Sequence, residues 1–286
     1  MPPDIIIPAG TALGELFGRL VARQRIVFFA GLPGVGKSLL VQQLAIMAQR
    51  VGRSVHLLQW DVTRAAFETD SILARYPESD GVTHIAIRKA VGFWARDAVH
   101  TWHVTHAGPE HMLIGEAALV GNRLIELAEV RTDAAEELLD GAETLFVIPV
   151  PSRQVRAAIE CAREQSIASP RHERESADAP PSVLQALWLD LYRLAHQLGL
   201  AENPGDGPVP YDPDVYAAAY RHMLRQRRAE TLPIESVLRS QGSVYDVDLI
   251  ASELAASPSE VERVMWQVEH GIEADSSGDG TISTRF

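Results

Sequence analysis

The chain has 286 residues, 46% of them hydrophobic, with 26 basic and 38 acidic side chains and a formal net charge of −12. This length suits one large α/β domain with a smaller appendage, and the acidic charge argues against a nucleic-acid partner. Its single cysteine, Cys161, excludes an intrachain disulfide and a cysteine-based metal site. The start, MPPDIIIPAG, lacks the features of a signal peptide, and no apolar run has the length of a bilayer span, so we expect a cytoplasmic protein without a membrane partner.

Hydrophobic patterning predicts strands that alternate with helices. The predicted strands are apolar or β-branched runs at 25–30, 54–60, 111–117, 144–150 and, as an edge strand because it contains a proline, 231–234. The predicted helices cover 11–24, 37–50, 82–106, 121–140, 182–199, 212–229, 246–256 and 258–270. The alternation implies an α/β fold with a doubly wound parallel sheet of about five strands, whose ligands lie at the carboxyl ends of the strands.

Composition divides the chain into a main domain and an appendage. We expect a main domain at 1–240, a small C-terminal helical cap at 241–270 and a disordered tail at 271–286. Within the main domain, 163–181 is rich in charge, serine and proline and poor in large apolar groups. This composition favours either a mobile flap or a solvated linker.

The most informative motif is GLPGVGKS at Gly31–Ser38, which fits the phosphate-loop pattern G-x-x-x-x-G-K-[ST] at every fixed position. A predicted strand precedes it and a predicted helix follows it, as the pattern requires. Its glycines let successive N–H groups converge on an anion, Lys37 would reach the β- and γ-phosphates, and the Ser38 hydroxyl would bind Mg²⁺. The residues expected to contact the nucleotide are Gly31, Pro33, Gly34, Val35, Gly36, Lys37, Ser38 and Leu39. The alternative is a glycine-rich turn without a ligand.

Two acidic residues follow the next two strands. Asp61 could accept a proton from a substrate hydroxyl or hold a Mg²⁺-bound water, and its alternative role is that of a helix N-cap. Arg64, one turn later, could clamp a phosphate or the acceptor. Glu116 follows Gly115, which occupies the position where an aspartate would ligate Mg²⁺ directly. Glu116 could hold the metal through water, which makes it the metal candidate besides Ser38, or bind the acceptor, and its alternative is a surface acid at the end of a strand. The expected catalytic residues are Lys37, Asp61, Arg64 and Glu116, and the neighbouring Asn122 and Arg123 could line the same crevice.

Arginines and histidines provide two further groups of candidates. Arg163, Arg171 and Arg174 lie in or beside the charged segment 163–181 and could close over a triphosphate, with Arg163 and Arg171 as nucleotide contacts. Four histidines, His100, His103, His106 and His111, cluster in the sequence. Their spacing fits no zinc pattern, so we interpret them as core and surface residues.

With these motifs, residues 25–180 resemble the P-loop kinase group, which includes nucleoside and nucleotide kinases, gluconate kinase and the zeta-toxin or chloramphenicol phosphotransferase type. The resemblance rests on GLPGVGKS, on Asp61 with Arg64, on Glu116 and on the arginine-bearing segment. It implies a P-loop NTPase fold with a C-terminal helical extension, ATP and Mg²⁺ as cofactors, and phosphoryl transfer to a hydroxyl or phosphate of a small-molecule acceptor. A homodimer is compatible with it.

Four rival functions remain open, one of which is a polynucleotide kinase, which the acidic net charge disfavours but does not exclude. A GTPase usually needs an N-K-x-D stretch, which the chain lacks, and a ring-type ATPase needs an Asp-Glu pair where the chain has Gly115-Glu116. A nucleotide-sensing module that binds ATP without turnover would share the glycine-rich loop. The discriminating observation is ATP binding with or without phosphate transfer or release.

Overall fold

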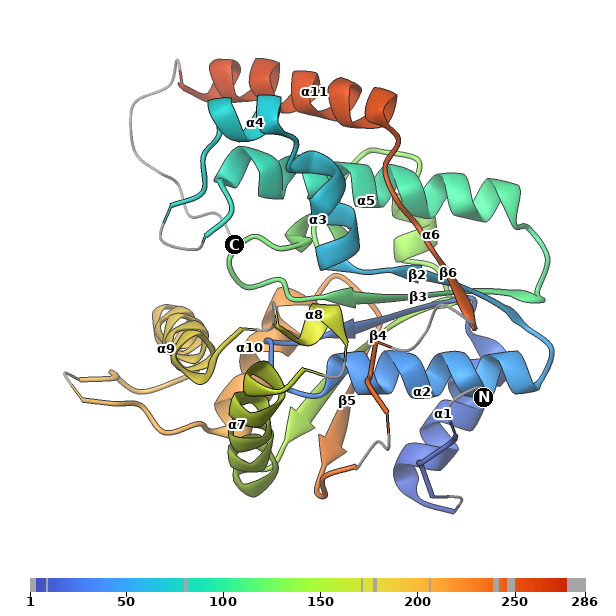
Figure 1. The fold of residues 1–286 in the computed structure, drawn as a ribbon, viewed down its shortest axis with the longest axis vertical. Helices are drawn as coiled ribbons and strands as arrows, with labels where there is room; N and C mark the ends of the chain where they lie inside the picture. Colours follow the sequence, from blue (N-terminus) through green and yellow to red (C-terminus); the bar gives the residue numbers. More distant parts are fainter. Residues whose placement is uncertain are drawn as a thin grey trace.

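The computed structural model describes residues 4–8, 10–79, 82–170, 172–176, 179–205, 207–238, 242–245 and 250–276. Its strands are Ile26–Ala30 (β1), Ser54–Leu58 (β2), His111–Ala117 (β3), Thr144–Pro151 (β4), Ala229–Ile234 (β5) and Ala251–Glu253 (β6). In this described part they form one open, all-parallel sheet with the order β5-β4-β1-β3-β2-β6 (Figure 1).

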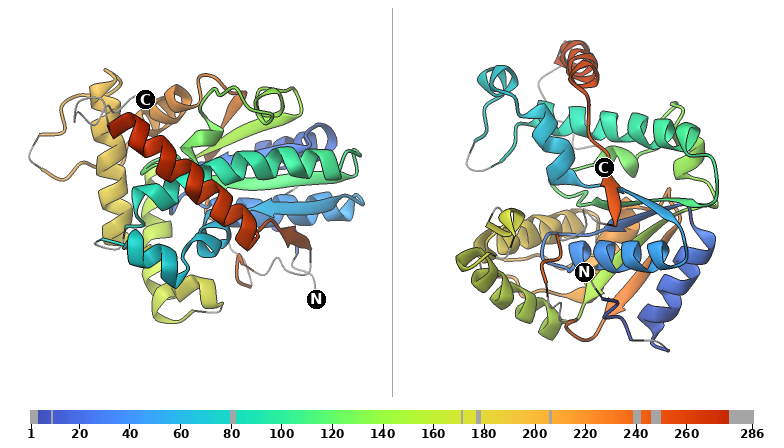
Figure 2. Two further views of the ribbon diagram at one scale, coloured as in Figure 1. Left: turned by 90° about the horizontal axis from the view of Figure 1, so that it is seen from above. Right: turned by 45° about the vertical axis from the view of Figure 1, so that its right-hand side comes forward.

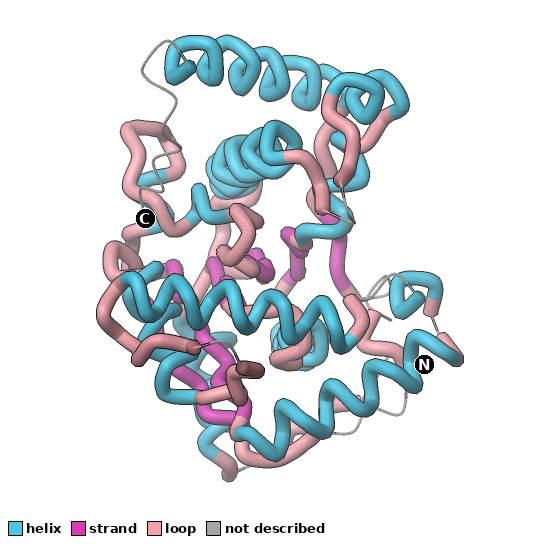
Figure 3. Tube along the Cα trace, turned by 90° about the vertical axis from the view of Figure 1, so that its left-hand side faces the viewer, coloured by secondary structure: helices cyan, strands magenta, loops and turns pink. Residues whose placement is uncertain are grey.

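Helices cover both faces of this sheet. They are Ala12–Arg23 (α1), Lys37–Arg50 (α2), Trp60–Phe67 (α3), Asp70–Arg75 (α4), Ile85–Thr105 (α5), Ile125–Leu127 (η1, a 3₁₀ turn), Glu136–Leu139 (α6), Arg153–Ala168 (α7), Glu173–Ser176 (α8), Pro181–Gln197 (α9), Pro213–Met223 (α10) and Pro258–Ser276 (α11). The strands, magenta in Figure 3, lie between the helical layers. This is an α/β fold with a parallel sheet buried on both faces, as the alternating pattern predicts.

The two faces of β1 build two separate cores. Val27 and Phe29 belong to the core beneath α1 and α2, whereas Phe28 belongs to the core that includes α5, α9, α10 and α11. The ring of Phe28 stacks on that of Phe146 from β4, with 5.1 Å between the centroids. Every residue of β1 is buried, which is typical of a central strand in a parallel sheet.

The strand order reverses beside β1. The chain leaves β1 through α2 and returns as β2 on one side, whereas from β4 it proceeds to β5 on the other side. In open α/β sheets, ligands bind at such a reversal, outside the carboxyl ends of the strands. The loop that follows β1 therefore lies at the position where this architecture places a ligand.

The C-terminal segment returns to the main sheet. β6 pairs with β2 through Val55 and Ala251, and α11 packs against α5, with Val264 fully buried (Figure 2). The division into a 1–240 domain and a 241–270 cap stays a prediction.

Most predicted elements are confirmed, including α1, the strand–loop–helix frame around Gly31–Ser38, β3, α5, and β5 as an edge strand. Four predictions differ from the structure. The helix predicted over 212–229 ends at Met223, and residue 229 already belongs to β5. The described sheet has six strands instead of about five; 121–140 holds only η1 and α6 instead of a long helix; and 251–253 is a strand instead of part of a helix. Residues 246–249 and 277–286 lie outside the described residues, and α11 runs to Ser276, beyond the expected start of a disordered tail.

Parts of the charged segment 163–181 are helical. Helix α7 continues to Ala168, α8 spans Glu173–Ser176, and α9 begins at Pro181. These helices lie beyond the carboxyl ends of the central strands, at the left of Figure 1. The segment is therefore partly helical and lies on the side of the sheet where the predicted site residues end their strands.

Candidate functional site

The glycine-rich loop Gly31–Ser38 connects β1 to α2. Gly34 and Gly36 adopt φ values of 76° and 86°, in the left-handed region that favours glycine. Gly36 is the N-cap of α2 and offers no side chain to the helix, and the N–H groups of Lys37, Ser38 and Leu39 have no acceptor among the described residues. Such a helix start favours an anion, because its free N–H groups and the helix dipole point the same way.

Lys37 folds back across this loop. Its Nζ donates a hydrogen bond of 3.1 Å to the Leu32 carbonyl, and the side chain is buried. Burial lowers the pKa of Lys37, while the charges of Glu116 and Asp61 act to raise it. The lysine therefore lies within electrostatic range of both predicted carboxylates.

A second cation, which the sequence analysis missed, holds the loop from outside. Arg156, in the first turns of α7, donates to the Pro33 carbonyl at 3.0 Å and pairs with Glu160 at 2.6 Å. Its side chain is only 2% exposed. Because Pro33 precedes Arg156 by 123 positions, no local signal in the sequence indicates this contact.

A cavity of about 420 Å³ opens beside the loop. Its lining includes all four predicted catalytic residues, most of the predicted nucleotide contacts and one flap arginine: Lys37, Asp61, Arg64 and Glu116; Pro33, Gly34, Gly36, Ser38 and Leu39; and Arg163. Gly31 and Val35 are buried outside this lining. The topology thus gathers the carboxyl ends of β1, β2 and β3 with α7 around one space.

Asp61 is the second residue of α3, and its side chain is 65% exposed. Its Oδ1 lies 3.8 Å from Arg64 Nη2, and Arg64 also contacts Glu68 at 3.0 Å. The structure gives α3 no side-chain cap, with Gln59 as its N-cap residue, so Asp61 does not perform the alternative capping role. An exposed carboxylate on the cavity wall is accessible to a bound acceptor.

The loop after β3 brings Arg123 to the same cavity. Three non-glycine residues around it, Leu119, Asn122 and Leu124, have positive φ values between 55° and 62°. Such conformations cost about 1–3 kcal/mol each and cluster at functional sites. Arg123 lines the cavity, whereas Asn122 does not. Burial lowers the pKa of Arg123, and the nearby charges of Asp61 and Arg64 oppose each other there.

The three arginines in or beside segment 163–181 occupy different positions. Arg163 lines the cavity, and its charge acts on Lys37. Arg174 instead donates to Gln59 Oε1 at 3.0 Å and to Glu253 Oε1 at 3.3 Å, so it ties α8 to the ends of β2 and β6. Arg171 lies outside the described residues.

The C-terminal part of the chain also contributes to the cavity, which sequence reasoning did not foresee. Val237, Leu238, Val244 and Tyr245 line it. Nearby, the Ser243 hydroxyl donates to Glu175 of α8 at 2.7 Å. The cavity therefore has a mixed wall, with charges at the strand ends and apolar groups from α7 and the C-terminal segment.

The chain matches no family model, and no curated protein matches it. Within the described residues, no helix has both the length and the apolar character that crossing a bilayer requires.

Proposed function

We propose that the chain is a P-loop NTPase of the kinase group, which binds ATP with Mg²⁺ in the cavity beside Gly31–Ser38 and transfers the γ-phosphoryl group to a small-molecule acceptor. The observation that carries this proposal is the complete GLPGVGKS pattern at the carboxyl end of central strand β1, where it borders a cavity lined by Asp61, Glu116 and a third carboxylate, Glu175.

The binding part of the proposal is supported by the geometry of the loop. The N–H groups at the start of α2 and the Lys37 ammonium are the donors that a triphosphate needs. In the structure Lys37 donates to the Leu32 carbonyl, and a phosphate oxygen would replace that acceptor. Ser38 would ligate Mg²⁺, and Glu116 would hold it directly or through water.

The transfer part assigns roles to Asp61, Lys37, Arg123 and Arg163. An acceptor oxygen forms a bond to the γ-phosphorus while the bond between that phosphorus and the β-bridging oxygen breaks, so that ADP leaves with the electron pair. Asp61 takes the proton of an acceptor hydroxyl. Lys37, Arg123 and Arg163 surround the phosphate side of the cavity with positive charge, which stabilises charge in the transition state.

The decisive experiment compares two lysine variants. The chain contains only two lysines, Lys37 and Lys89, and Lys89 lies on α5 outside the cavity lining. Lys37→Ala should weaken Mg²⁺-ATP binding, measured by calorimetry, or abolish turnover, whereas Lys89→Ala should behave like the parent. Equal affinity and equal turnover in all three proteins would refute the proposal.

The acceptor is then sought with the parent protein. ATP consumption is measured over a metabolite library, with ADP and phosphorylated product quantified together. Equimolar ADP and product supports a kinase. ADP with inorganic phosphate alone would indicate an ATPase, and tight ATP binding without ADP formation would indicate a nucleotide-sensing module.

A further inference from the structure

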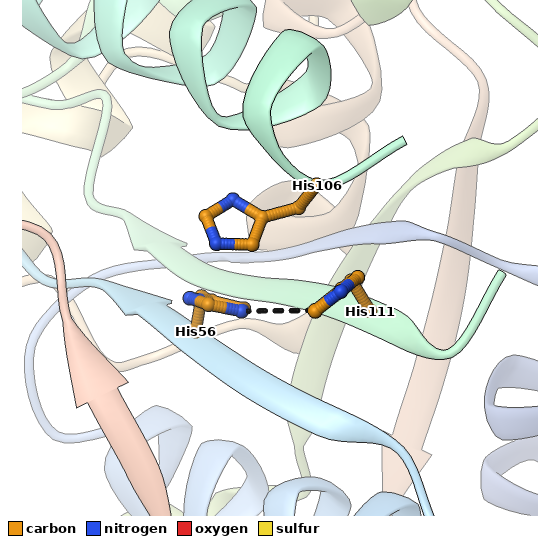
Figure 4. A group of neighbouring side chains, drawn as sticks. All are labelled: His56, His106 and His111. Atoms are coloured by element: carbon orange, nitrogen blue, oxygen red, sulfur yellow. Dashed lines mark hydrogen bonds between the residues drawn. The ribbon is translucent and has the colours of Figure 1, made fainter. Parts of the chain in front are cut away.

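Three histidines converge at the amino-terminal edge of the sheet, at the opposite end of the strands from the cavity. His56 lies in the middle of β2, His111 begins β3, and His106 follows the last residue of α5 (Figure 4). One ring nitrogen from each lies within 4.8 Å of those of the other two. Sequence spacing alone could pair His106 with His111 but could not add His56, which strand pairing brings in.

The distances approach those of a tetrahedral zinc site. Zinc–nitrogen bonds of about 2.0–2.1 Å place two ligating nitrogens about 3.3 Å apart. His56 Nε2 and His111 Nδ1 are 3.4 Å apart. The ring centroid of His106 lies 4.2 Å from that of His56 and 4.8 Å from that of His111, so the third ring must move closer for all three nitrogens to share one ion.

Hydrogen-bond partners determine which ring nitrogen of His106 and of His111 faces the other histidines. His106 Nδ1 lies 2.9 Å from the Thr105 hydroxyl and 3.2 Å from the Trp102 carbonyl. The carbonyl can only accept and the hydroxyl donates to the Thr101 carbonyl, so a hydrogen on Nδ1 satisfies both contacts and leaves Nε2 with a lone pair. In Figure 4 this nitrogen points toward the other two rings. His111 Nε2 lies 3.6 Å from a Glu110 carboxylate oxygen, which leaves Nδ1 facing His56. Such outer partners orient metal-binding histidines.

The backbone of the cluster is held by two arginines. Arg53 donates to the His111 carbonyl at 2.8 Å, and Arg25 donates to the His106 carbonyl. These two bonds fix the backbone from which the His106 and His111 rings project toward His56.

We propose that His56, His106 and His111 form a binding site for a divalent transition-metal ion. Zn²⁺ is the ion that we expect to bind, with a water molecule as its fourth ligand. Three imidazoles suit Zn²⁺, Cu²⁺ or Ni²⁺, whereas Mg²⁺ and Ca²⁺ prefer oxygen ligands. His56 and His111 also line a surface cavity of about 530 Å³, which gives the ion and its water an access path. The bound ion links β2, β3 and the end of α5, and this inference is independent of the proposed nucleotide chemistry.

The test uses the full chain without a histidine tag, stripped of metal with a chelator. Zn²⁺ is titrated in competition with a chromophoric chelator, and thermal unfolding is followed with and without Zn²⁺. We expect one Zn²⁺ per chain and a higher melting temperature with Zn²⁺, because an ion that binds only the folded state stabilises it. Mg²⁺ in place of Zn²⁺ should leave the melting temperature unchanged.

Matched variants assign the ligands. His56→Gln, His106→Gln and His111→Gln should each weaken Zn²⁺ binding at least 10-fold, and His100→Gln, a half-buried histidine of α5 outside the cluster, should bind like the parent. If a ligand variant fails to fold, nitrogen-15 shifts of the parent's imidazoles decide, because only the three ligand rings should shift with Zn²⁺. Absence of stoichiometric binding, or equal binding by all variants, would overturn the proposal.

Discussion

The pH dependence of folding should report a single buried carboxyl group. Glu126, in η1, is 3% exposed, and its Oε2 has no hydrogen-bond partner among the described residues. The carboxyl group packs directly against α5 at Gly92, where a Cβ atom would lie 1.7 Å from Oε2. Burial, followed by the charge of Glu129, raises the pKa of Glu126 from 4.5 to about 8. The folded chain therefore keeps a proton there at neutral pH.

The direction of the effect follows from proton linkage. Between pH 4.5 and 8 the unfolded chain has lost a proton that the folded chain still holds, so the free energy of unfolding falls as pH rises. Within this window, each pH unit lowers the free energy of unfolding by about 1.4 kcal/mol. Integrated from pH 5 to pH 8, the Glu126 contribution to stability falls by about 3.5 kcal/mol, and it is constant below about pH 4 and above about pH 9.

Glu126→Gln removes the titration and keeps the shape of the protonated group. The free energy of unfolding of the variant minus that of the parent should rise by about 3.5 kcal/mol from pH 5 to pH 8, since other titrating groups cancel in the difference. Both free energies are measured by urea unfolding at constant temperature. Glu137→Gln, an exposed glutamate of α6, serves as the control and should show no such trend. A difference between variant and parent that is the same at every pH would refute a buried, protonated Glu126.

Two further predictions concern the cavity. Asp61→Asn should lower kcat roughly 10²-fold, in line with a positioned base, and leave ATP affinity unchanged; full activity would remove Asp61 from the chemistry. Arg156→Gln should weaken ATP binding and destabilise the fold by about 1–3 kcal/mol, because the Pro33 carbonyl loses a buried donor. The control is Arg153→Gln, on the same helix, because the Arg153 side chain is 66% exposed. Equal affinities of the two variants for ATP, measured by calorimetry, would contradict the inference that Arg156 holds the loop.

Strands and the long helices could be predicted because their signals are local. β1, β3 and α2 are runs whose apolar spacing and flanking glycines specify the element within a dozen residues. β6 could not be predicted in this way, since Ala251–Glu253 contains no strongly strand-forming residue. This strand exists because it pairs with β2, a partner almost 200 positions earlier.

The wrong helix at 121–140 has a similar long-range cause. Its charged residues would suit a helix, but Arg96 of α5 donates to the carbonyls of Glu126 and Glu129, at 2.6 and 3.0 Å. A continuous helix would use those carbonyls as acceptors for its own N–H groups. Because they accept from Arg96 instead, the backbone does not form one long helix here. Arg227 adds a bond to the Leu127 carbonyl at 2.9 Å. The 121–140 window contains neither Arg96 nor Arg227, so its local pattern cannot indicate these bonds.

The candidate site divides along the same line. The Gly31–Ser38 loop could be predicted from the sequence because its residues are consecutive. Asp61 and Glu116 could be predicted because they follow or end parallel strands, whose carboxyl ends lie at one edge of the sheet. Arg156 and the wall formed by Val244 and Tyr245 were not readable, because their places depend on tertiary packing. Sequence thus indicated the charged half of the cavity and missed its apolar half.

Gly115, the residue before Glu116, limits which carboxylate of β3 could hold the proposed Mg²⁺ ion. A Cβ atom at Gly115 would lie 2.6 Å from the Phe28 ring, which is itself stacked on Phe146. An aspartate there is sterically excluded unless this aromatic pair moves. β3 can therefore offer only Glu116 to the cavity, where its charge acts on Lys37.

This restriction makes Glu116→Gln the sharpest test of Mg²⁺ binding. If Glu116 holds the metal, the variant should bind Mg²⁺-ATP more weakly than the parent, because a neutral amide attracts the dication less than a carboxylate does. Metal-free ATP should bind the variant at least as well, since a negative charge near the phosphates is gone. Affinities are measured by calorimetry with Mg²⁺ and with a chelator. A loss of the same size under both conditions would mean that Glu116 supports the loop through its charge on Lys37 and not through the metal.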